Sequence, residues 1–149
     1  MLKQLSIKNY ALIDELVAEF SGGLNIITGE TGAGKSILLG GLALVLGKRA
    51  DLGQIKDKSK KCIVEAFLKI EGFSLKDYFE KNDLDYDQEL ILRRELLSSG
   101  KSRAFVNDTP VRLEVLQAIG GRLIDVHSQN QTLQYYEERK SALSSKNST

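Results

Sequence analysis

The chain has 149 residues, of which 42% are hydrophobic and 28% are charged. This length suffices for one globular domain of ordinary size and is too short for two full domains. The hydrophobic share excludes a disordered chain, and a single proline excludes collagen and proline-rich linkers. Lysine and arginine number 21 against 20 aspartates and glutamates, so a strongly basic DNA-coating domain is excluded, whereas local DNA contacts are not.

The sequence favours a cytoplasmic protein without a membrane partner. No apolar run approaches the roughly 18 residues of a transmembrane helix, and the N-terminus lacks the hydrophobic region of a signal peptide. Cys62 is the single cysteine, so no internal disulfide can form, which fits a reducing compartment. Its apolar neighbours predict a buried strand position rather than a reactive thiol.

The first third of the chain predicts three short strands and a helix. Apolar residues within 2–7 and 13–20 indicate the first two strands. The compact apolar run 24–28 predicts a buried central strand. Residues 37–46 are apolar nearly all round, so we expect a helix that is enclosed by neighbours and ends at Gly47.

The middle of the chain predicts a lobe rich in strands. Polar residues 51–61 indicate a loop, and 63–70 a strand. Ser74 is a plausible N-cap for a short helix. Beyond an acidic loop, we expect 89–96 and 102–106 to form a hairpin.

The remaining residues predict a turn, a helix and a last strand. Asn107–Asp108 suits a tight turn with positive φ. Helical spacing indicates a helix over 111–119, which Gly120–Gly121 would end. Residues 122–126 are expected to form the final strand, and the small polar residues 141–149 a frayed tail.

The segment GETGAGKS fills every fixed position of the phosphate-binding pattern G-x-x-x-x-G-K-[ST]. Its glycines let successive backbone N–H groups form an anion nest, to which the following helix adds its positive end. We expect Lys35 to neutralise phosphate oxygens and the Ser36 hydroxyl to bind Mg²⁺. The chain is thus expected to bind a nucleoside triphosphate. The residues expected to contact the nucleotide are Gly29, Glu30, Thr31, Gly32, Ala33, Gly34, Lys35, Ser36 and Ile37.

This pattern selects neither the nucleotide nor the reaction. GTPases, small-molecule kinases, ABC-type ATPases and recombinases all use such a loop. Asp125, after Leu123 and Ile124, is the only downstream candidate for the carboxylate that holds Mg²⁺ through water. Because only two clear apolar residues precede it and no acid follows it, an aspartate that caps a strand end explains it better than a Walker B residue.

Three segments together resemble the RecN family, bacterial ATPases of DNA double-strand-break repair that are related to the SMC (structural maintenance of chromosomes) proteins. They are LSIKNYALIDELVAEFSGGLNIITGETGAGKSILLGGLALVLGKRAD, ILRRELLSSGKSRAFVNDTPV and LIDVHSQNQ, and the likeness covers about residues 1–134. The resemblance implies an α/β P-loop fold, the N-terminal half of an ABC/SMC-type ATPase head with a mixed sheet and a lobe that contains a β-hairpin. Residues 1–140 would form this head segment.

The resemblance also implies ATP and Mg²⁺ as cofactors. Gln129 falls where the Q-loop glutamine belongs, so Lys35 and Gln129 would be catalytic residues, and Ser36 and Gln129 would bind Mg²⁺. Asp125 then moves away from the Walker B role, because the family places that aspartate far downstream. His127 becomes a loop residue that forms hydrogen bonds.

Three basic features leave alternatives open. Arg49 matches a position at which SMC-like heads often carry an arginine near the nucleotide or the DNA, but a cation at a helix end explains it equally well. Arg103 on the hairpin favours a structural role over a catalytic one. The lysines of the run Lys56–Lys61 suit DNA phosphates, although such a run is usually a solvated face.

The resemblance further implies partners. In the family, a coiled coil and a C-terminal head segment follow, and two heads enclose two ATP molecules. We therefore expect three partners: the C-terminal head segment, a second head and, in the full-length protein, DNA. The full-length protein would then be associated with the nucleoid. The signature motif, Walker B and heptads are missing from this sequence, so weak or no ATP turnover is expected of this chain alone. The alternatives are a stand-alone P-loop kinase or GTPase with Asp125 as Walker B, and a truncated non-catalytic head that pairs with a full-length partner.

Overall fold

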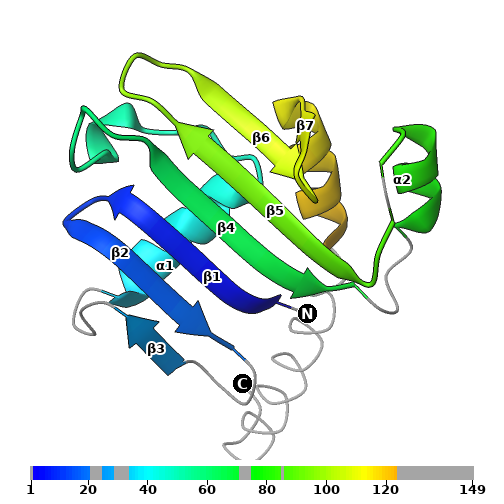
Figure 1. Ribbon diagram of the computed structural model, residues 1–149, viewed down its shortest axis with the longest axis horizontal. Coiled ribbons are helices and arrows are strands. Elements are labelled where there is room, and N and C mark those ends of the chain that lie inside the picture. Colours follow the sequence, from blue (N-terminus) through cyan, green and yellow to red (C-terminus); the bar gives the residue numbers. More distant parts are fainter. Residues whose placement is uncertain (1, 21–24, 29–33, 71–74, 85, 124–149) are drawn as a thin grey trace, which may run out of the picture.

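The computed structural model describes residues 2–20, 25–28, 34–70, 75–84 and 86–123. Its body is a seven-stranded sheet with the order β3-β2-β1-β4-β5-β6-β7, in which every neighbouring pair is antiparallel (Figure 1). The strands are β1 (Leu2–Tyr10), β2 (Ile13–Glu19), β3 (Asn25–Thr28), β4 (Cys62–Lys69), β5 (Glu89–Leu96), β6 (Ser102–Val106) and β7 (Thr109–Val111).

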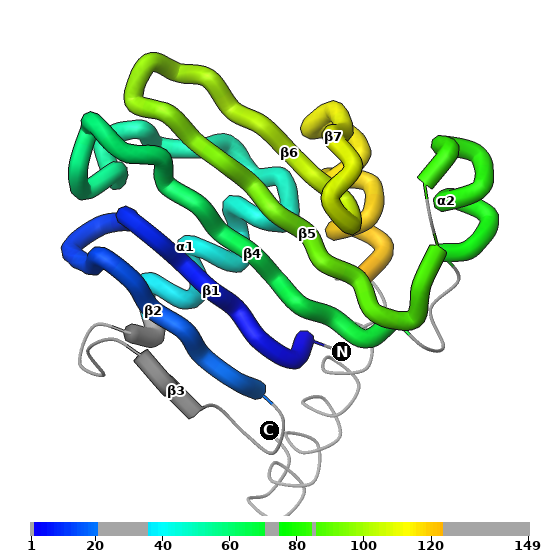
Figure 2. Tube along the Cα trace, viewed as in Figure 1, coloured from blue at the N-terminus to red at the C-terminus, as the bar shows by residue number. Residues whose placement is uncertain are grey.

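Helices cover one face of this sheet. The helix α1 (Gly34–Val45) lies behind β1, β4 and β5 and contacts all three (Figure 2). Residues 113–123 form a further helix that contacts the end of α1. The short helices are η1 (Leu52–Gln54), before β4, and α2 (Lys76–Lys81), between β4 and β5. No helix among the described residues is long and apolar enough to cross a membrane.

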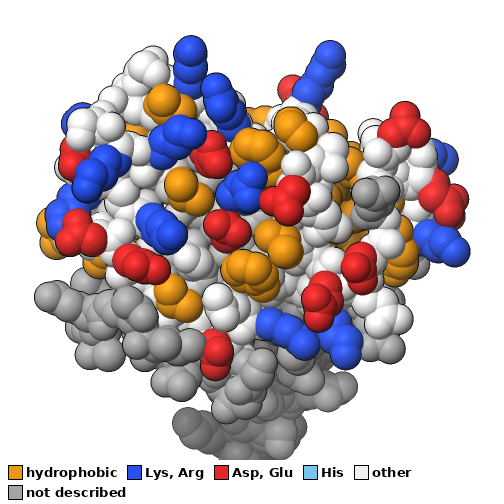
Figure 3. Space-filling model, viewed as in Figure 1, with side chains coloured by type: hydrophobic (Ala, Val, Ile, Leu, Met, Phe, Trp, Pro, Cys, Tyr) orange, Lys and Arg blue, Asp and Glu red, His pale blue; other side chains and the backbone are white. Residues whose placement is uncertain are grey.

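The strands bury alternate residues because successive side chains point to opposite faces. In β4 and β5 this alternation is regular over eight residues each, and the buried members face α1. The opposite face, turned to the viewer in Figure 3, carries interspersed acidic, basic and hydrophobic side chains. The core under α1 includes Leu5, Ile7, Leu16, Val45, Val64, Leu90, Leu92, Leu116 and Ile119.

The close approach of α1 to β1 leaves little room for a side chain at two positions of the helix. A Cβ atom at Gly41 would overlap Ile7 Cδ1, and one at Gly40 would lie 2.5 Å from the Tyr10 hydroxyl. Glycine in a helix interior costs about 1 kcal/mol relative to alanine. Close packing of the helix on the strand offsets that cost.

Most expected elements of the first two thirds are confirmed. Both early strands, the helix after GETGAGKS and the 89–106 hairpin are present, and Asn107 and Asp108 have φ of 47° and 66°. The strand over 24–28 was expected to be central, but β3 is the edge strand of the described sheet and pairs only with β2. A continuous apolar run indicates burial on both faces and does not set a strand's place in the order.

Three expectations for local structure are wrong. Leu75, not Ser74, occupies the N-cap position of α2. The last described helix runs through Gly120 and Gly121 to residue 123, so neither glycine ends it and 122–123 are helical rather than extended. Neither has positive φ. At Gly120 a Cβ would lie 2.9 Å from the Leu46 carbonyl oxygen, so this glycine permits contact with the chain after α1.

Cys62 is buried in β4, as the sequence predicts. Burial raises the pKa of its thiol to about 11, and nearby Arg94 lowers the pKa by less. The thiolate is the reactive form of cysteine, so the folded chain holds this sulfur in an inert state.

Gly41→Ala should destabilise the chain by about 1–3 kcal/mol, because the added methyl group forces α1 away from Ile7. The matched control is Gly121→Ala, where a Cβ would meet nothing within 4 Å. It should stabilise the chain by about 0.5–1 kcal/mol through helix propensity. Urea denaturation of the three proteins measures both effects, and equal stabilities would contradict this packing.

Cys62 should react with a thiol reagent at pH 8 at least about a hundredfold more slowly in native buffer than in guanidinium chloride, because burial both shields the thiol and suppresses its ionisation. Absorbance after addition of an aromatic disulfide reagent follows the reaction. Similar rates in the two buffers would show that Cys62 is accessible in the folded chain.

Candidate functional site

The candidate site lies between a strand and a helix. The strand β3 ends at Thr28 and α1 begins at Gly34, so residues 29–33 connect the two in the sequence. Those five residues lie outside the described part of the chain, as do the expected site residues Asp125, His127 and Gln129. The described frame is therefore the end of β3 and the first turn of α1.

The first turn of α1 is suited to an anion. An α-helix leaves its first backbone N–H groups without helical partners, and its dipole places partial positive charge there. The first turn of α1 contains no acidic residue that would neutralise this charge. Ser36 is exposed, whereas Ile37 is 6% exposed and belongs to the core. A ligand can therefore reach Ser36, whereas little of Ile37 is open to solvent.

The other end of α1 is closed by backbone hydrogen bonds. Gly47 has φ of +93°, the left-handed conformation that commonly ends helices. The Gly47 N–H donates to the Leu44 carbonyl at 3.1 Å, and the Lys48 N–H donates to the Ala43 carbonyl at 3.0 Å. This pair of bonds is the Schellman pattern, so the expected helix end at Gly47 is confirmed.

Two side chains from distant elements also bind this end of α1. Arg94 Nη1 donates to the carbonyl oxygens of Leu44, at 2.9 Å, and Lys48, while Arg94 Nε donates to Ser102 Oγ at 3.3 Å. Gln117 Nε2 donates to the Gly47 carbonyl at 2.9 Å. Sequence reasoning did not single out Arg94, although the alternation of β5 places it on the core face with Leu92.

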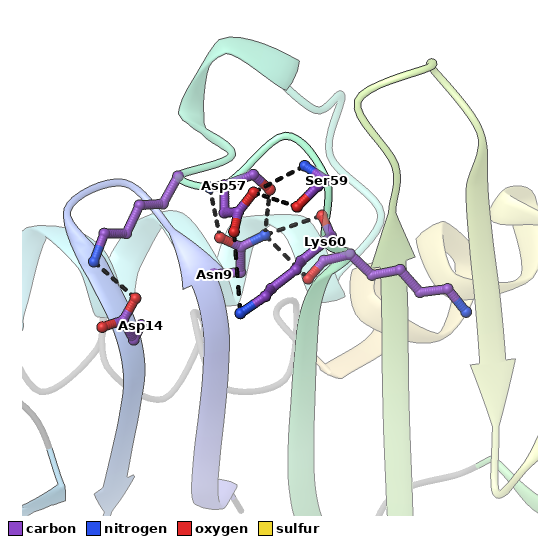
Figure 4. Close-up of polar contacts among 7 residues, drawn as sticks. Asn9, Asp14, Asp57, Ser59 and Lys60 are labelled. Atoms are coloured by element: carbon purple, nitrogen blue, oxygen red, sulfur yellow. Dashed lines mark hydrogen bonds and ion pairs between the residues drawn. The ribbon is translucent and has the colours of Figure 1, made fainter.

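Asn9 organises the loop that precedes β4. It is 7% exposed and has φ of +57°. Its Nδ2 donates to the carbonyls of Asp57 and Lys60 at 2.9 and 3.0 Å, and its Oδ1 accepts from the Asp57 N–H at 2.7 Å (Figure 4). A further bond joins Asn9 Nδ2 to the Lys61 carbonyl at 3.3 Å. The asparagine of IKNYALID therefore holds this loop in place. Its sequence neighbours do not predict this role, because the bonded residues lie about fifty positions away.

The lysines of the run Lys56–Lys61 are held by contacts within the chain. Lys56 Nζ lies 2.7 Å from Asp14 Oδ1, and this hydrogen bond, with the charge of Lys56, keeps the pKa of Asp14 below its ordinary value. Lys61 lies 3.4 Å from Glu95. Lys58 donates to a backbone carbonyl at 2.7 Å, and Lys60 lies 4.0 Å from an Asp57 oxygen. A run that has local partners on all four lysines resembles a solvated face more than an open phosphate-binding strip.

Arg49 and Arg103 are both exposed. Arg49 lies four residues beyond the end of α1, outside its last turn. Arg103 lies opposite Glu95 in the register of β5 and β6, and opposite charges across two strands stabilise the pair. The placement of Arg103 agrees with a structural role.

Comparison with known proteins gives the class of this chain. A family model described as an AAA domain matches residues 4–148. In solved structures, an SMC ATPase studied for ATP-driven dimerisation and DNA-stimulated activation gives a TM-score of 0.61 at 20% identity over 81% of this chain and 78% of that chain. The Smc head domain of Pyrococcus furiosus, solved with an extended coiled coil and bound to the C-terminal domain of ScpA, gives 0.60 at 20% identity, covering 81% and 32%. The chain belongs to the AAA-domain family and has the fold of an SMC-type ATPase head.

A closer relationship appears in the sequence. The DNA repair protein RecN of Vibrio cholerae is 42% identical over 131 residues, which are 87% of this chain and 24% of that protein. The chain thus spans about a quarter of the length of the curated relatives it matches. It corresponds to the N-terminal head segment of RecN-type proteins, as the three sequence segments predict.

Asn9→Ala should destabilise the chain by about 2 kcal/mol or more, because it removes several partly buried hydrogen bonds and leaves backbone groups of the loop unpaired. Asn82→Ala is the control, since Asn82 is exposed and its amide donates one bond, to the Tyr78 carbonyl. That variant should change stability by less than about 0.5–1 kcal/mol. Thermal unfolding monitored by circular dichroism separates the two, and equal losses would contradict the role of Asn9.

Proposed function

We propose that this chain is the ATP-binding N-terminal segment of a RecN-like ATPase that acts in DNA double-strand-break repair and recombination. The sequence similarity to proteins named DNA repair protein RecN supports the cellular role. The helix α1, which begins inside the GETGAGKS segment with an unneutralised positive end, supports nucleotide binding. This placement of the loop between a strand and a helix N-terminus is the observation that carries the proposal.

The proposed ligand is ATP with Mg²⁺. Residues 29–37 would surround the phosphates, Lys35 would neutralise β- and γ-phosphate oxygens, and the exposed Ser36 hydroxyl would bind the metal ion. Gln129 would complete the Mg²⁺ site and orient the attacking water. A bound Mg²⁺ supplies charge stabilisation to the transferring phosphoryl group. The residues of this chain hold and orient the phosphates, and the carboxylate that polarises water would come from elsewhere.

A second layer of protein would cover α1 in the complete head. The sheet buries one side of this helix, but Leu39, on its other side, is 69% exposed. The helix had been expected to be enclosed on all sides, since nearly every residue between Ile37 and Leu46 is apolar. The exposure of Leu39 on a helix this apolar supports a contact between α1 and another protein segment. The C-terminal head segment of the same protein is the proposed occupant.

Further partners belong to the assembled protein. A second head, joined through bound ATP, and DNA are proposed, with support from the solved SMC ATPase whose study concerns ATP-driven dimerisation and DNA-stimulated activation. The proposed location is the cytoplasm, at the nucleoid. Turnover by this chain alone is expected to be weak or absent.

Lys35→Ala should weaken binding of a fluorescent ATP analogue with Mg²⁺ at least about tenfold, because the positive charge facing the phosphates is lost. The control is Lys58→Ala. Lys58 lies in the loop before β4, outside the GETGAGKS segment, and donates to the Leu52 carbonyl. This variant should leave affinity within about twofold. Equal affinity of wild type and Lys35→Ala, or no saturable binding by wild type, would overturn the proposed nucleotide site.

A further inference from the structure

Arg94 is a buried cation whose counter-charge comes from the end of a helix. Its side chain is 2% exposed, and among the described residues no carboxylate forms an ion pair with it. An unpaired buried charge is strongly unfavourable. The carbonyl of Leu44, in the last turn of α1, and that of Lys48, three residues beyond the helix, accept its hydrogen bonds instead. Burial nevertheless lowers the pKa of Arg94 from its ordinary value.

This contact adds a directional constraint to the packing of α1 on the sheet. Gly40 and Gly41 set how closely the middle of the helix approaches Tyr10 and Ile7 of β1, whereas apolar packing supplies no directional bond at the C-terminal end of the helix. A planar guanidinium that binds two carbonyls and the Ser102 hydroxyl demands a defined position of all three. Arg94 therefore joins β5 to α1 in one register.

The position of one helix end determines the other. An α-helix rises 1.5 Å per residue, so the 12 residues of α1 form a stiff rod of about 18 Å. Leu44 lies at the anchored end, whereas Lys35 and Ser36 lie in the first turn at the opposite end. A shift or tilt at Leu44 is carried to the first turn of α1, where the proposed nucleotide would bind.

We propose that Arg94 is a positioning residue for nucleotide binding, which acts through α1 on Lys35 and Ser36. This inference rests on the proposed function, in that it assumes that the first turn of α1 binds a nucleoside triphosphate. Arg94 does not touch the ligand in this scheme. Its role is to hold the helix in the register that aligns the phosphate-binding groups.

The test compares Arg94→Met and Arg94→Lys with wild type in the full 149-residue chain. Methionine keeps the apolar stem, and lysine keeps the charge but loses the planar fork. Phe79→Leu is the control, because it removes core volume in α2, apart from α1 (Figure 2). Each protein is titrated with a fluorescent ATP analogue and Mg²⁺ below its unfolding transition, and amide hydrogen exchange of 34–45 is measured without nucleotide.

Arg94→Met should weaken binding at least about tenfold and speed exchange in α1, with Arg94→Lys between it and wild type. Phe79→Leu should bind within about twofold of wild type and leave exchange in α1 unchanged. Binding by a folded Arg94→Met within twofold of wild type would overturn the proposal, as would equal weakening by Phe79→Leu. If Arg94→Met does not fold, Arg94→Lys carries the same comparison.

Failure of the proposed function gives a different result. In that case wild type shows no saturable binding, or Lys35→Ala binds as tightly as wild type. The proposed effect of Arg94 on nucleotide binding is then rejected as well. Hydrogen exchange alone then tests whether Arg94 anchors the C-terminal end of α1. Faster exchange in 34–45 only in the Arg94 variants supports the anchor, and unchanged exchange refutes it.

Discussion

The placement of α1 on the antiparallel sheet is the constraint on which the candidate site depends. Gly40 and Gly41 let the helix approach Tyr10 and Ile7 of β1 closely, because an added Cβ atom at either position would collide with these side chains. Gly47 ends the helix, Arg94 donates to the Leu44 carbonyl in its last turn, and Gln117 donates to the carbonyl of Gly47. The result is a helix whose C-terminal end accepts hydrogen bonds from other parts of the chain, while its first turn contains no acidic residue.

Apolar and polar contacts make different contributions to the stability of this chain. The apolar core supplies most of the stability of the sheet and of α1, because apolar burial is the dominant favourable term in folding. Buried polar side chains add direction, since a hydrogen bond left unmade in the interior is costly. Asn9 fixes the loop before β4, and Arg94 fixes the end of α1. Both come from strands and both act on backbone groups of a distant segment.

Sequence reasoning predicts the local elements of this chain well where a regular period or a turn residue is present. The helix end at Gly47, the 89–106 hairpin and the Asn107–Asp108 turn all follow from single-residue chemistry. Tertiary contact overrides such rules at Gly120, where closeness to Leu46, and not a helix end, explains the glycine.

In the candidate site, too, local features are predicted from the sequence and long-range contacts are not. The sequence predicts the phosphate loop, because its residue types are set by ligand chemistry within eight positions. Arg94 and Asn9 act on partners about fifty residues away in the chain, and a local pattern carries no such information. The lysine run shows the converse, since Asp14 and Glu95, which neutralise two of its members, lie in other strands. Whether a run of lysines is open to a ligand depends on the residues that the fold places beside it.

Under the proposed function, this chain is one of two layers of an ATPase head, with α1 between them. The most direct test is titration calorimetry of the chain with the C-terminal head segment of a RecN relative. Wild type should form a one-to-one complex, and Leu39→Asp should weaken it at least about tenfold by placing a charge on the outer side of α1. The control Leu12→Asp, at an exposed position in the β1–β2 turn, should bind like wild type. No complex, or equal binding by Leu39→Asp, would contradict the account.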